Sequence, residues 1–265
     1  MKAAQVNKTG GNMAKVSVLI LAKNEEKNIG DCIESVKSFA DEIIVIDDFS
    51  TDATAEISKN LGAKIFQRAL NGDWASQRNF SIQQASCDWI FFLDSDERAT
   101  PGLGEEIKKI LAVDDKNFAW RTARLNYFYG QPIWHGGWFP GYVTRLLPRE
   151  GTTVEGAVHE KIVHQCTEKN IDSTKYLIHY PYRDWTHQLS KLNTYTDLMA
   201  ERLHEEGKTA SVFDIIFRPL WAGFRMYILR GGFLDGVMGL CLSGYHIFYT
   251  LVKYIKLYYI DKNNL

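Results

Sequence analysis

The sequence contains few cysteines and no paired cysteine motif. Its four cysteines among 265 residues are Cys32, Cys87, Cys166 and Cys241, and no two form a Cys-x-x-Cys pair. A structural zinc site or a disulfide framework normally shows closely or regularly spaced cysteines. The sequence therefore excludes these scaffolds and predicts reduced, partly buried thiols in a cytosolic protein.

An excess of charge of one sign is also absent. The chain has 31 Lys and Arg against 32 Asp and Glu, a net charge of -1. A nucleic-acid-binding protein normally carries a basic excess, so we expect no nucleic-acid partner. Hydrophobic residues at 45% and charged residues at 24% are typical of globular proteins.

The first residues lack the apolar run of a secretory signal. Residues 1–12 are polar, and Met13 stands just before the first apolar segment. We expect no signal peptide here. Residues 1–13 are instead expected to form a flexible leader, with Met13 as an alternative start.

The first hundred residues alternate apolar runs with amphipathic segments. Short β-branched runs predict strands over residues 16–22, 42–46, 64–67 and 89–93. Helices are predicted between them, and the order β-α-β-α-β-α-β implies a parallel sheet with helices on both faces. The expected fold class is therefore α/β.

Each predicted helix has its own signal. In the first, Asn24 is an expected N-cap, and an apolar stripe follows at positions 29, 32, 33 and 36. Capping side chains at 50–52 begin the second helix, which is expected to stop at Gly62. The third is predicted over 76–85.

The rest of the chain changes character twice. From 119 to about 164, alternating runs rich in Trp, Tyr, Gly and Arg predict antiparallel strands and loops. After Pro181 the pattern becomes helical. Two or three helices are expected over 212–260, broken at Pro219 and at Gly231-Gly232.

Carboxylates follow two of the predicted strands. Asp47 and Asp48 follow the second strand, and Asp94 and Asp96 follow the fourth. In parallel sheets ligands bind just beyond the carboxyl ends of the strands. Alternation along the chain points Asp94 and Asp96 to the same side, where one carboxylate can meet a ribose and the other a divalent cation. Mg²⁺ and Mn²⁺ are typically coordinated by one or two carboxylates together with substrate phosphates.

Four ordered motifs carry a resemblance to a known family. They are Leu19-Ile20-Leu21-Ala22-Lys23-Asn24-Glu25-Glu26, Val45-Ile46-Asp47-Asp48-Phe49-Ser50-Thr51-Asp52, Gln77-Arg78-Asn79 and Phe92-Leu93-Asp94-Ser95-Asp96-Glu97. Together they resemble family 2 inverting glycosyltransferases, which have the GT-A fold, a Rossmann-like arrangement for nucleotide-diphospho-sugars.

The resemblance implies roles for the matching residues. Asp48 would contact the uracil or ribose, Ala22 and Lys23 would line the base pocket, and Arg78 would contact the nucleotide. Asp94 would bind the ribose or metal, and Asp96 would ligate a Mg²⁺ or Mn²⁺ ion that bridges the phosphates. Two simpler roles stay open: Asp52 as a helix cap and Asp47 as a turn-fixing residue.

The second half resembles a narrower group, the bacterial lipopolysaccharide core β-glucosyltransferases. The motifs that carry this resemblance are Gly137-Trp138-Phe139-Pro140, Arg145-Leu146-Leu147, Glu155-Gly156-Ala157-Val158-His159-Glu160, Arg218-Pro219-Leu220 and Arg230-Gly231-Gly232-Phe233-Leu234-Asp235-Gly236. Ala157 stands where many of that group carry proline. The resemblance favours UDP-glucose as donor and a lipopolysaccharide inner-core or other lipid-linked envelope glycan as acceptor.

An inverting transfer needs a base on the acceptor side. We nominate Glu160, with Glu155 as the rival. His159 is a metal ligand, an acceptor contact or an orienter of Glu160. Arg145 either holds a phosphate or forms a surface ion pair.

The aromatic residues of the middle segment have two possible roles. Two of them are expected to stack on acceptor sugars, Trp138 among the candidates, while the rest form core. The set is Tyr127, Tyr129, Trp134, Trp138 and Tyr142.

The tail is rich in aromatic and basic residues. Residues 236–252 form a run of 17 without Asp, Glu, Lys or Arg, at the short limit for a membrane span. We expect helices lying on the cytoplasmic leaflet of the bacterial inner membrane as a peripheral anchor. A helical cap or dimer interface is the alternative.

These observations predict the following domain organisation. A GT-A catalytic domain is expected over 14–185, with a nucleotide-binding half (14–100) and an acceptor-binding half (101–185). A helical, membrane-associating region would follow over 186–265. A nucleotidyltransferase and a non-catalytic sugar-nucleotide-binding protein are the alternative functions; the first normally has a Gly-rich phosphate loop, which Lys23-Asn24-Glu25-Glu26 is not.

Overall fold

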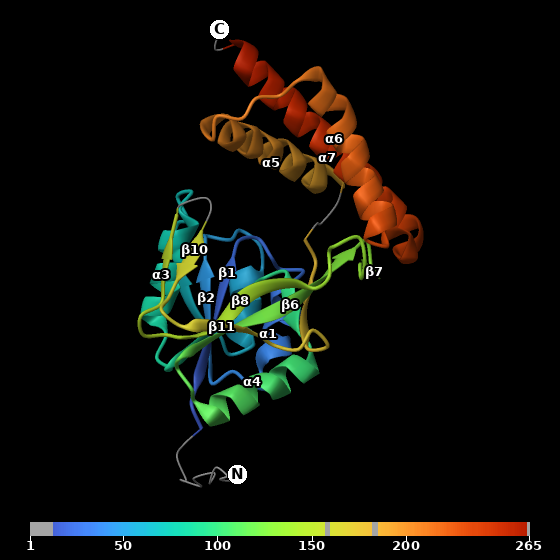
Figure 1. Cartoon of the computed structure of the whole chain (residues 1–265). Helices are drawn as coiled ribbons and strands as arrows, with labels where there is room; N and C mark the ends of the chain where they lie inside the picture. Colours follow the sequence, from blue (N-terminus) through green and yellow to red (C-terminus); the bar gives the residue numbers. More distant parts are fainter. Residues whose placement is uncertain (1–12, 157–159, 182–184, 264–265) are drawn as a thin grey trace. The chain divides into compact units, whose positions relative to one another are not determined.

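The computed structural model describes residues 13–156, 160–181 and 185–263 (Figure 1). The chain forms two compact units. The first comprises Met1–Thr122 and Tyr142–Leu177, and the second comprises Ala123–Gly141 and Ile178–Leu265. Residues 1–12 of the expected leader lie outside the described residues.

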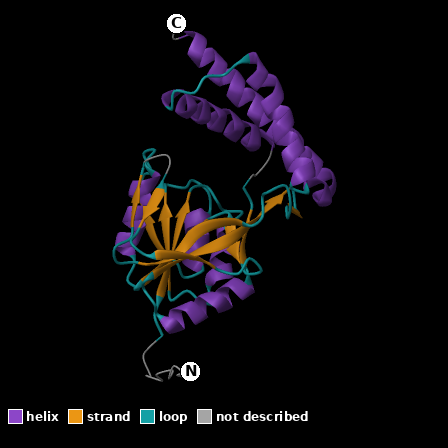
Figure 2. Cartoon of the chain, in the orientation of Figure 1, coloured by secondary structure: helices purple, strands orange, loops and turns teal. Residues whose placement is uncertain are grey.

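A parallel sheet forms the centre of the first unit (Figure 2). Strand β1 (Val16–Ala22) lies between β2 (Glu42–Asp47) and β4 (Trp89–Asp94), and β3 (Lys64–Gln67) pairs with the far edge of β2. All three pairings are parallel. The predicted parallel β-α repeat is confirmed.

Strand β1 is buried on both faces because helices cover both sides of the sheet. Val16, Val18 and Ile20 pack with residues of helices α1 and α4, while Leu19 and Leu21 pack with residues of α3. Every residue of β1 is buried. This explains why the strand is a continuous apolar run rather than an alternating one.

The helices of the first unit follow the predicted order, with one addition. They are α1 (Ile29–Val36), α2 (Thr54–Asn60), α3 (Trp74–Gln84) and α4 (Pro101–Val113). The expected stripe at 29, 32, 33 and 36 is buried. Helix α4 was not expected, although Pro101 at its first turn and the buried Leu103, Ile107, Ile110 and Leu111 are ordinary helix signals.

The expected N-cap at Asn24 is wrong. Helix α1 begins at Ile29, and Asn24 has a φ of 52° in the loop before it. Its side-chain oxygen accepts a hydrogen bond from the Thr51 amide at 2.8 Å. Asn24 therefore joins the loops after β1 and β2 instead of capping a helix.

The remaining strands extend this sheet, except β9 and β10, which form a separate antiparallel pair. The full order is β3-β2-β1-β4-β8-β6-β12-β5. Strand β8 runs antiparallel to β4, as predicted for the middle segment, whereas β11 pairs in parallel with β6. The bounds are β5 (Glu97–Ala99), β6 (Phe118–Phe128), β7 (Gln131–Pro132), β8 (Gly141–Pro148), β9 (Thr153–Glu155), β10 (Lys161–Val163), β11 (Thr167–Asn170) and β12 (Tyr176–His179).

The second unit is mostly helical (Figure 2). It contains α5 (Trp185–Glu205), α6 (Val212–Phe224), a π-helical turn (Arg225–Leu229), a 3-10 turn (Gly232–Asp235) and α7 (Gly236–Asn263). The expected break at Gly231-Gly232 is confirmed, and Gly231 has a φ of 68°. None of the helices in the described part of the chain is long and apolar enough to cross a bilayer.

The expected break at Pro219 is wrong. Pro219 lies inside α6 and is buried. It removes one backbone donor from the helix. Packing of α6 along α7 and the capping box formed by Ser211 and Asp214 hold the helix together on either side of that gap.

Residues 123–141, expected in the acceptor half, belong to the second unit. Phe128 and Ile133 form an apolar cluster with Met226 and Leu242 of the helical part. The buried Asp235 carboxylate accepts the amide N–H groups of Trp134 at 3.2 Å and His135 at 2.9 Å. The loop after β7 is thus attached to the helices by both apolar and polar contacts.

Candidate active site

The carboxyl ends of β2 and β4 bring acidic residues to both sides of β1. In the strand register Ala22 lies opposite Asp47, and Leu21 lies opposite Asp94. The Asp48 amide donates to the Ala22 carbonyl at 2.9 Å. The aspartates of two separate motifs are therefore held at one edge of the sheet, where α/β sheets bind ligands.

Asp47 and Asp48 have different environments. Asp47 is fully buried, and both of its carboxylate oxygens accept the Ser50 amide, at 3.3 and 3.1 Å. Asp48 accepts a hydrogen bond from Lys23 Nζ at 2.6 Å and one from the Leu70 amide at 3.0 Å. Burial opposes its charge, but these two donors lower the pKa of Asp48. Asp47 thus fixes the turn, while Asp48 and Lys23 form a charged pair at the loop surface.

Asp52 belongs to the same turn region. Its carboxylate accepts the Thr54 amide at 3.0 Å and the Glu26 amide at 3.1 Å. It therefore satisfies a backbone donor at the start of α2, as a capping side chain does, and also ties down the loop after β1.

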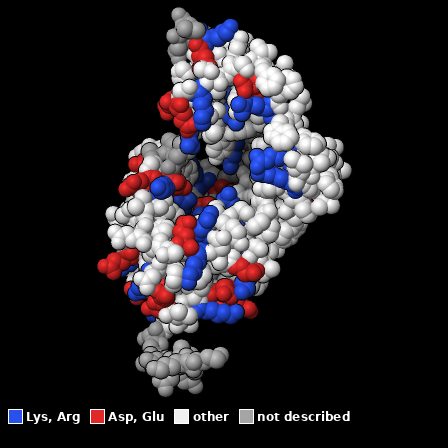
Figure 3. Space-filling view, viewed as in Figure 1, with Lys and Arg blue, Asp and Glu red and all other residues white. Residues whose placement is uncertain are grey.

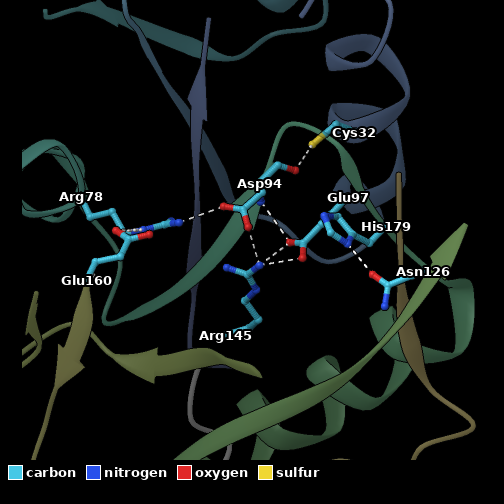
Figure 4. Close-up of polar contacts among 8 residues, drawn as sticks. All are labelled: Cys32, Arg78, Asp94, Glu97, Asn126, Arg145, Glu160 and His179. Atoms are coloured by element: carbon cyan, nitrogen blue, oxygen red, sulfur yellow. Dashed lines mark hydrogen bonds and ion pairs between the residues drawn. The ribbon is translucent and has the colours of Figure 1, made fainter. Parts of the chain in front are cut away.

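Asp94 is held between two arginines (Figure 4). Arg78 Nη2 of α3 lies 2.9 Å from Asp94 Oδ1, and Arg145 Nη2 of β8 lies 2.6 Å from Oδ2. Burial alone would raise the pKa of Asp94, but Arg145 and Arg78 outweigh it and hold the pKa well below its usual range. Asp94 is therefore a carboxylate in the folded protein.

Arg78 also contacts the nominated base. Its Nε donates to Glu160 Oε2 at 2.7 Å (Figure 4). Glu160 precedes β10, so this contact joins it to a helix more than 80 positions earlier. The other carboxylate oxygen, Oε1, accepts no hydrogen bond from the described residues. One side of Glu160 is thus fixed in place.

Glu97 is a site residue that the sequence analysis gave no role. It is fully buried in β5, and its two oxygens lie 2.6 and 2.7 Å from Arg145 Nη2. The Asp94 amide donates to Glu97 Oε2 at 3.1 Å. Arg145 therefore forms a buried ion pair with two carboxylates rather than a surface pair. The only hint of this role in the sequence was the acidic Glu97 at the start of the short strand Glu97-Arg98-Ala99.

A cysteine also lies at this edge of the sheet. Cys32 Sγ of α1 is 3.5 Å from the Asp94 carbonyl oxygen (Figure 4). Burial is the main cause that raises the pKa of the Cys32 thiol well above its ordinary value. The neutral thiol packs behind the site and is not a nucleophile.

Both arginines retain a buried donor without a partner among the described residues. These donors are Arg78 Nη1 and Arg145 Nε. An unsatisfied buried donor costs stability, and a guanidinium is well suited to a phosphate oxygen. The unsatisfied Arg78 donor therefore fits an anionic ligand at this edge.

The residues fit a cation that is shared with a ligand. Within the described ranges no group of three or more His, Cys, Asp or Glu side chains is arranged to hold a metal. Both oxygens of Asp94 are engaged by arginines. Asp96 lies half-buried in the turn between β4 and β5, and a carboxylate is the kind of ligand that Mg²⁺ or Mn²⁺ combines with phosphate oxygens.

The remaining predicted residues are dispersed. His159 lies outside the described residues. Glu155 is exposed in β9, opposite Lys161 in the register. Trp138 belongs to the second unit, where it packs edge-on against Phe128 at 5.2 Å.

The other aromatic residues of the middle segment have separate partners. Tyr127 packs against Tyr180, Tyr129 stacks on Trp185, Trp134 packs against Phe139, and Tyr142 lies under the Arg121 guanidinium. These contacts lie at four different places in the described part of the chain.

Comparison with known proteins identifies relatives over most of the chain. Residues 17–163 match the model of glycosyl transferase family 2. The lipopolysaccharide core biosynthesis glycosyltransferase LpsC of Rhizobium meliloti (strain 1021) is 32% identical over 254 residues, which cover 92% of each chain. An uncharacterized glycosyltransferase of Rickettsia prowazekii is 28% identical over 258 residues, covering 92% of this chain and 86% of the other.

Among solved structures the likeness is partial. Glucosyl-3-phosphoglycerate synthase from Mycobacterium tuberculosis, in complex with Mn²⁺, UDP and glucosyl-3-phosphoglycerate, is 21% identical. The match covers 48% of this chain and 51% of that one, with a TM-score of 0.35.

Proposed function

Because the chain belongs to glycosyl transferase family 2, we propose that it transfers a hexose from a UDP-sugar to a lipid-linked glycan with inversion. The expected enzyme class and the expected α/β GT-A fold with a helical C-terminal region are confirmed. UDP-glucose is the favoured donor, and a lipopolysaccharide inner-core glycan is the favoured acceptor.

One observation carries the proposal. Arg78 connects Asp94, at the end of β4, to Glu160, before β10. The residue assigned to the donor and the residue assigned to the acceptor proton are therefore joined by a single side chain. A nucleotidyltransferase whose nucleophile is a phosphate oxygen has no need of a base at this position, since that oxygen is already ionised.

The donor is assigned to the edge formed by β1, β2 and β4. Asp48 and Lys23 form a pair at the loop surface, suited to the polar edge of a nucleoside, and Ala22 ends β1 next to them. The unsatisfied Nη1 of Arg78 is suited to the diphosphate. Asp96 would hold a divalent cation, which when bound neutralises charge on the departing diphosphate.

Glu160 is assigned the acceptor proton. The acceptor hydroxyl gives its proton to the Glu160 carboxylate as its oxygen bonds to the anomeric carbon, and the bond from that carbon to the diphosphate breaks. Attack from the face opposite the leaving group inverts the anomeric configuration. Arg78 keeps Glu160 in position through Oε2.

The lipid-linked acceptor is proposed from the named relative and from the helical unit. LpsC is named for lipopolysaccharide core biosynthesis. Helix α6 exposes an apolar stripe whose side chains are between 48% and 64% exposed, made of Phe213, Ile216, Phe217, Leu220 and Phe224. This spacing places them on one helical face. We assign that face to the cytoplasmic surface of the inner membrane as a peripheral contact.

The function is tested by product analysis. The purified enzyme is incubated with a panel of UDP-sugars and Mn²⁺ or Mg²⁺, with and without a heptose-containing lipid acceptor. The proposal expects UDP release that depends on the acceptor and is greatest with UDP-glucose. Pyrophosphate release, or no turnover with any sugar and acceptor of the panel, contradicts it.

A further inference from the structure

The second unit contains a cavity that includes none of the residues assigned to the donor or to the acceptor proton. Its volume is about 410 Å³, within the range of sites for small molecules. It lies among the loop after β7, helix α6 with its π-helical turn, and α7. Its lining includes Trp138, Trp221, Tyr245, Arg225, Arg230 and His246.

Two arginines, Arg225 and Arg230, line the cavity. Neither Arg225 nor Arg230 forms an ion pair with any of the described residues. Asp235, the buried carboxylate of the adjoining 3-10 turn, already accepts the amides of Trp134 and His135 and contacts the His135 ring at 2.9 Å. Its charge is therefore directed to the loop and not to the guanidinium groups.

The loop is shaped to hold Arg230. The Gly136 amide donates to the Arg230 carbonyl at 2.9 Å. Gly137 has a φ of 83°, and a Cβ there would lie 2.5 Å from Arg230 Nη1. Only a residue without a side chain leaves room for the guanidinium against the backbone. The position of Arg230 is thus built into the fold.

The positive charges of this region also act on one another. Burial lowers the pKa of His246, and Lys253 and Arg230 lower it further. Lys253 itself has a pKa lowered by burial and by Arg218. Figure 3 shows basic side chains next to broad uncharged areas on the helical unit. A ligand of this cavity should therefore be an anion.

Aromatic side chains supply the remaining walls. Trp138, Trp221 and Tyr245 are among the residues that line the cavity. Trp221 is 57% exposed, and its ring lies 5.9 Å from that of Phe224 in the apolar α6 stripe. The cavity is therefore continuous with the face assigned to the membrane.

We propose that this cavity binds the phosphate of a lipid headgroup. Arg225 and Arg230 hold the phosphate oxygens, as arginine does through paired N–H donors. The rings pack against the rest of the headgroup, while the apolar stripe of α6 contacts the lipid chains. The lipid source rests on the proposed membrane contact, but the site contains none of the residues assigned to the donor or to the acceptor proton.

The test compares two double variants of the full chain. R225Q/R230Q removes both cavity charges, and R202Q/K208Q removes two exposed charges elsewhere in the same unit. Binding of monomeric, short-chain phosphatidic acid is measured by calorimetry, with inorganic phosphate and a short-chain phosphatidylcholine as separate probes. We expect R225Q/R230Q to raise the Kd for phosphatidic acid at least about tenfold, because two charge-assisted contacts are lost, and R202Q/K208Q to leave it nearly unchanged.

Several outcomes overturn the proposal. Equal losses in both double variants would mean diffuse charge attraction. Inorganic phosphate binding as tightly as phosphatidic acid would mean a site for free phosphate. Absence of phosphatidic acid binding by the wild type would also overturn it. The Asp96→Asn chain separates this site from the proposed function, since it should lose UDP release and keep the binding of phosphatidic acid.

Discussion

At the scale of single residues, the site depends on how buried charges are neutralised. Asp94 and Glu97 share Arg145, and Asp94 also pairs with Arg78. A buried ion is tolerated only when its partners and hydrogen bonds are complete. The same contacts that stabilise this edge of the sheet therefore also keep Asp94 and Glu160 fixed.

Removal of Arg145 should destabilise the fold. Arg145→Met removes the arginine that the buried Glu97 and Asp94 share, and leaves Asp94 with one arginine instead of two. We expect the free energy of unfolding to fall by about 3–5 kcal/mol, the usual cost of breaking a buried pair. Chemical denaturation measures it. Arg202→Met, which breaks an exposed pair with Glu206, is the control and should cost less than about 1 kcal/mol. Equal effects would mean that the buried network adds no stability.

Glu160 and Glu155 make a matched pair of carboxylates. Glu160→Gln should lower turnover by about 10²- to 10⁴-fold, because the acceptor proton loses its acceptor. Glu155→Gln, on the exposed strand β9, should leave turnover close to wild type. UDP binding by both variants checks that the fold is kept. Normal turnover in Glu160→Gln together with a loss in Glu155→Gln would move the base to Glu155.

At the scale of elements, close packing of α7 requires glycine at one position but not at another. In α7 a Cβ at Gly239 would lie 1.8 Å from the Gly232 carbonyl oxygen, whereas one at Gly244 meets nothing within 4 Å. Gly239→Ala should therefore lower the free energy of unfolding by about 1–3 kcal/mol. Gly244→Ala should raise it by about 0.5–1 kcal/mol through lower backbone entropy. Thermal and chemical denaturation measure both, and effects of the same sign would contradict the packing described here.

The apolar stripe of α6 gives a second prediction for an element. Phe217→Asp with Leu220→Asp places charge on the face assigned to lipid. Each side chain contributes about 1.5–3 kcal/mol when fully buried, so cosedimentation with vesicles should fall at least about tenfold. Val113→Asp, at a side chain 75% exposed in the first unit, is the control. Unchanged cosedimentation of the double variant would show that this face does not bind membranes.

Local sequence patterns predict some of these helices and strands but not others. Strands β1 to β4 and their helices were predictable because their apolar periodicity is local. The continuation of α6 through Pro219 was not, since it depends on packing against α7. Helix α4 was missed although its apolar spacing and Pro101 were present in the sequence.

At the scale of the whole molecule, the site combines residues that are far apart in the sequence. The strand-end aspartates could be predicted because parallel strands end at one edge. The pairing of Asp94 with Arg145, 51 positions later, and the burial of Glu97 could not, because no local pattern encodes which side chain meets another across the fold. Whether Trp138 and His159 contact the acceptor stays a prediction.

The most direct test of the central claim is UDP binding with and without Mn²⁺. The account places the nucleoside near Asp48 and the cation on Asp96, so wild type should bind UDP more tightly when Mn²⁺ is present. Calorimetry should show that Asp96→Asn loses this Mn²⁺ dependence, that Asp48→Asn binds UDP more weakly with or without Mn²⁺, and that Glu155→Gln matches wild type. UDP binding that is unaffected by Mn²⁺ and equal in all four proteins would contradict the account.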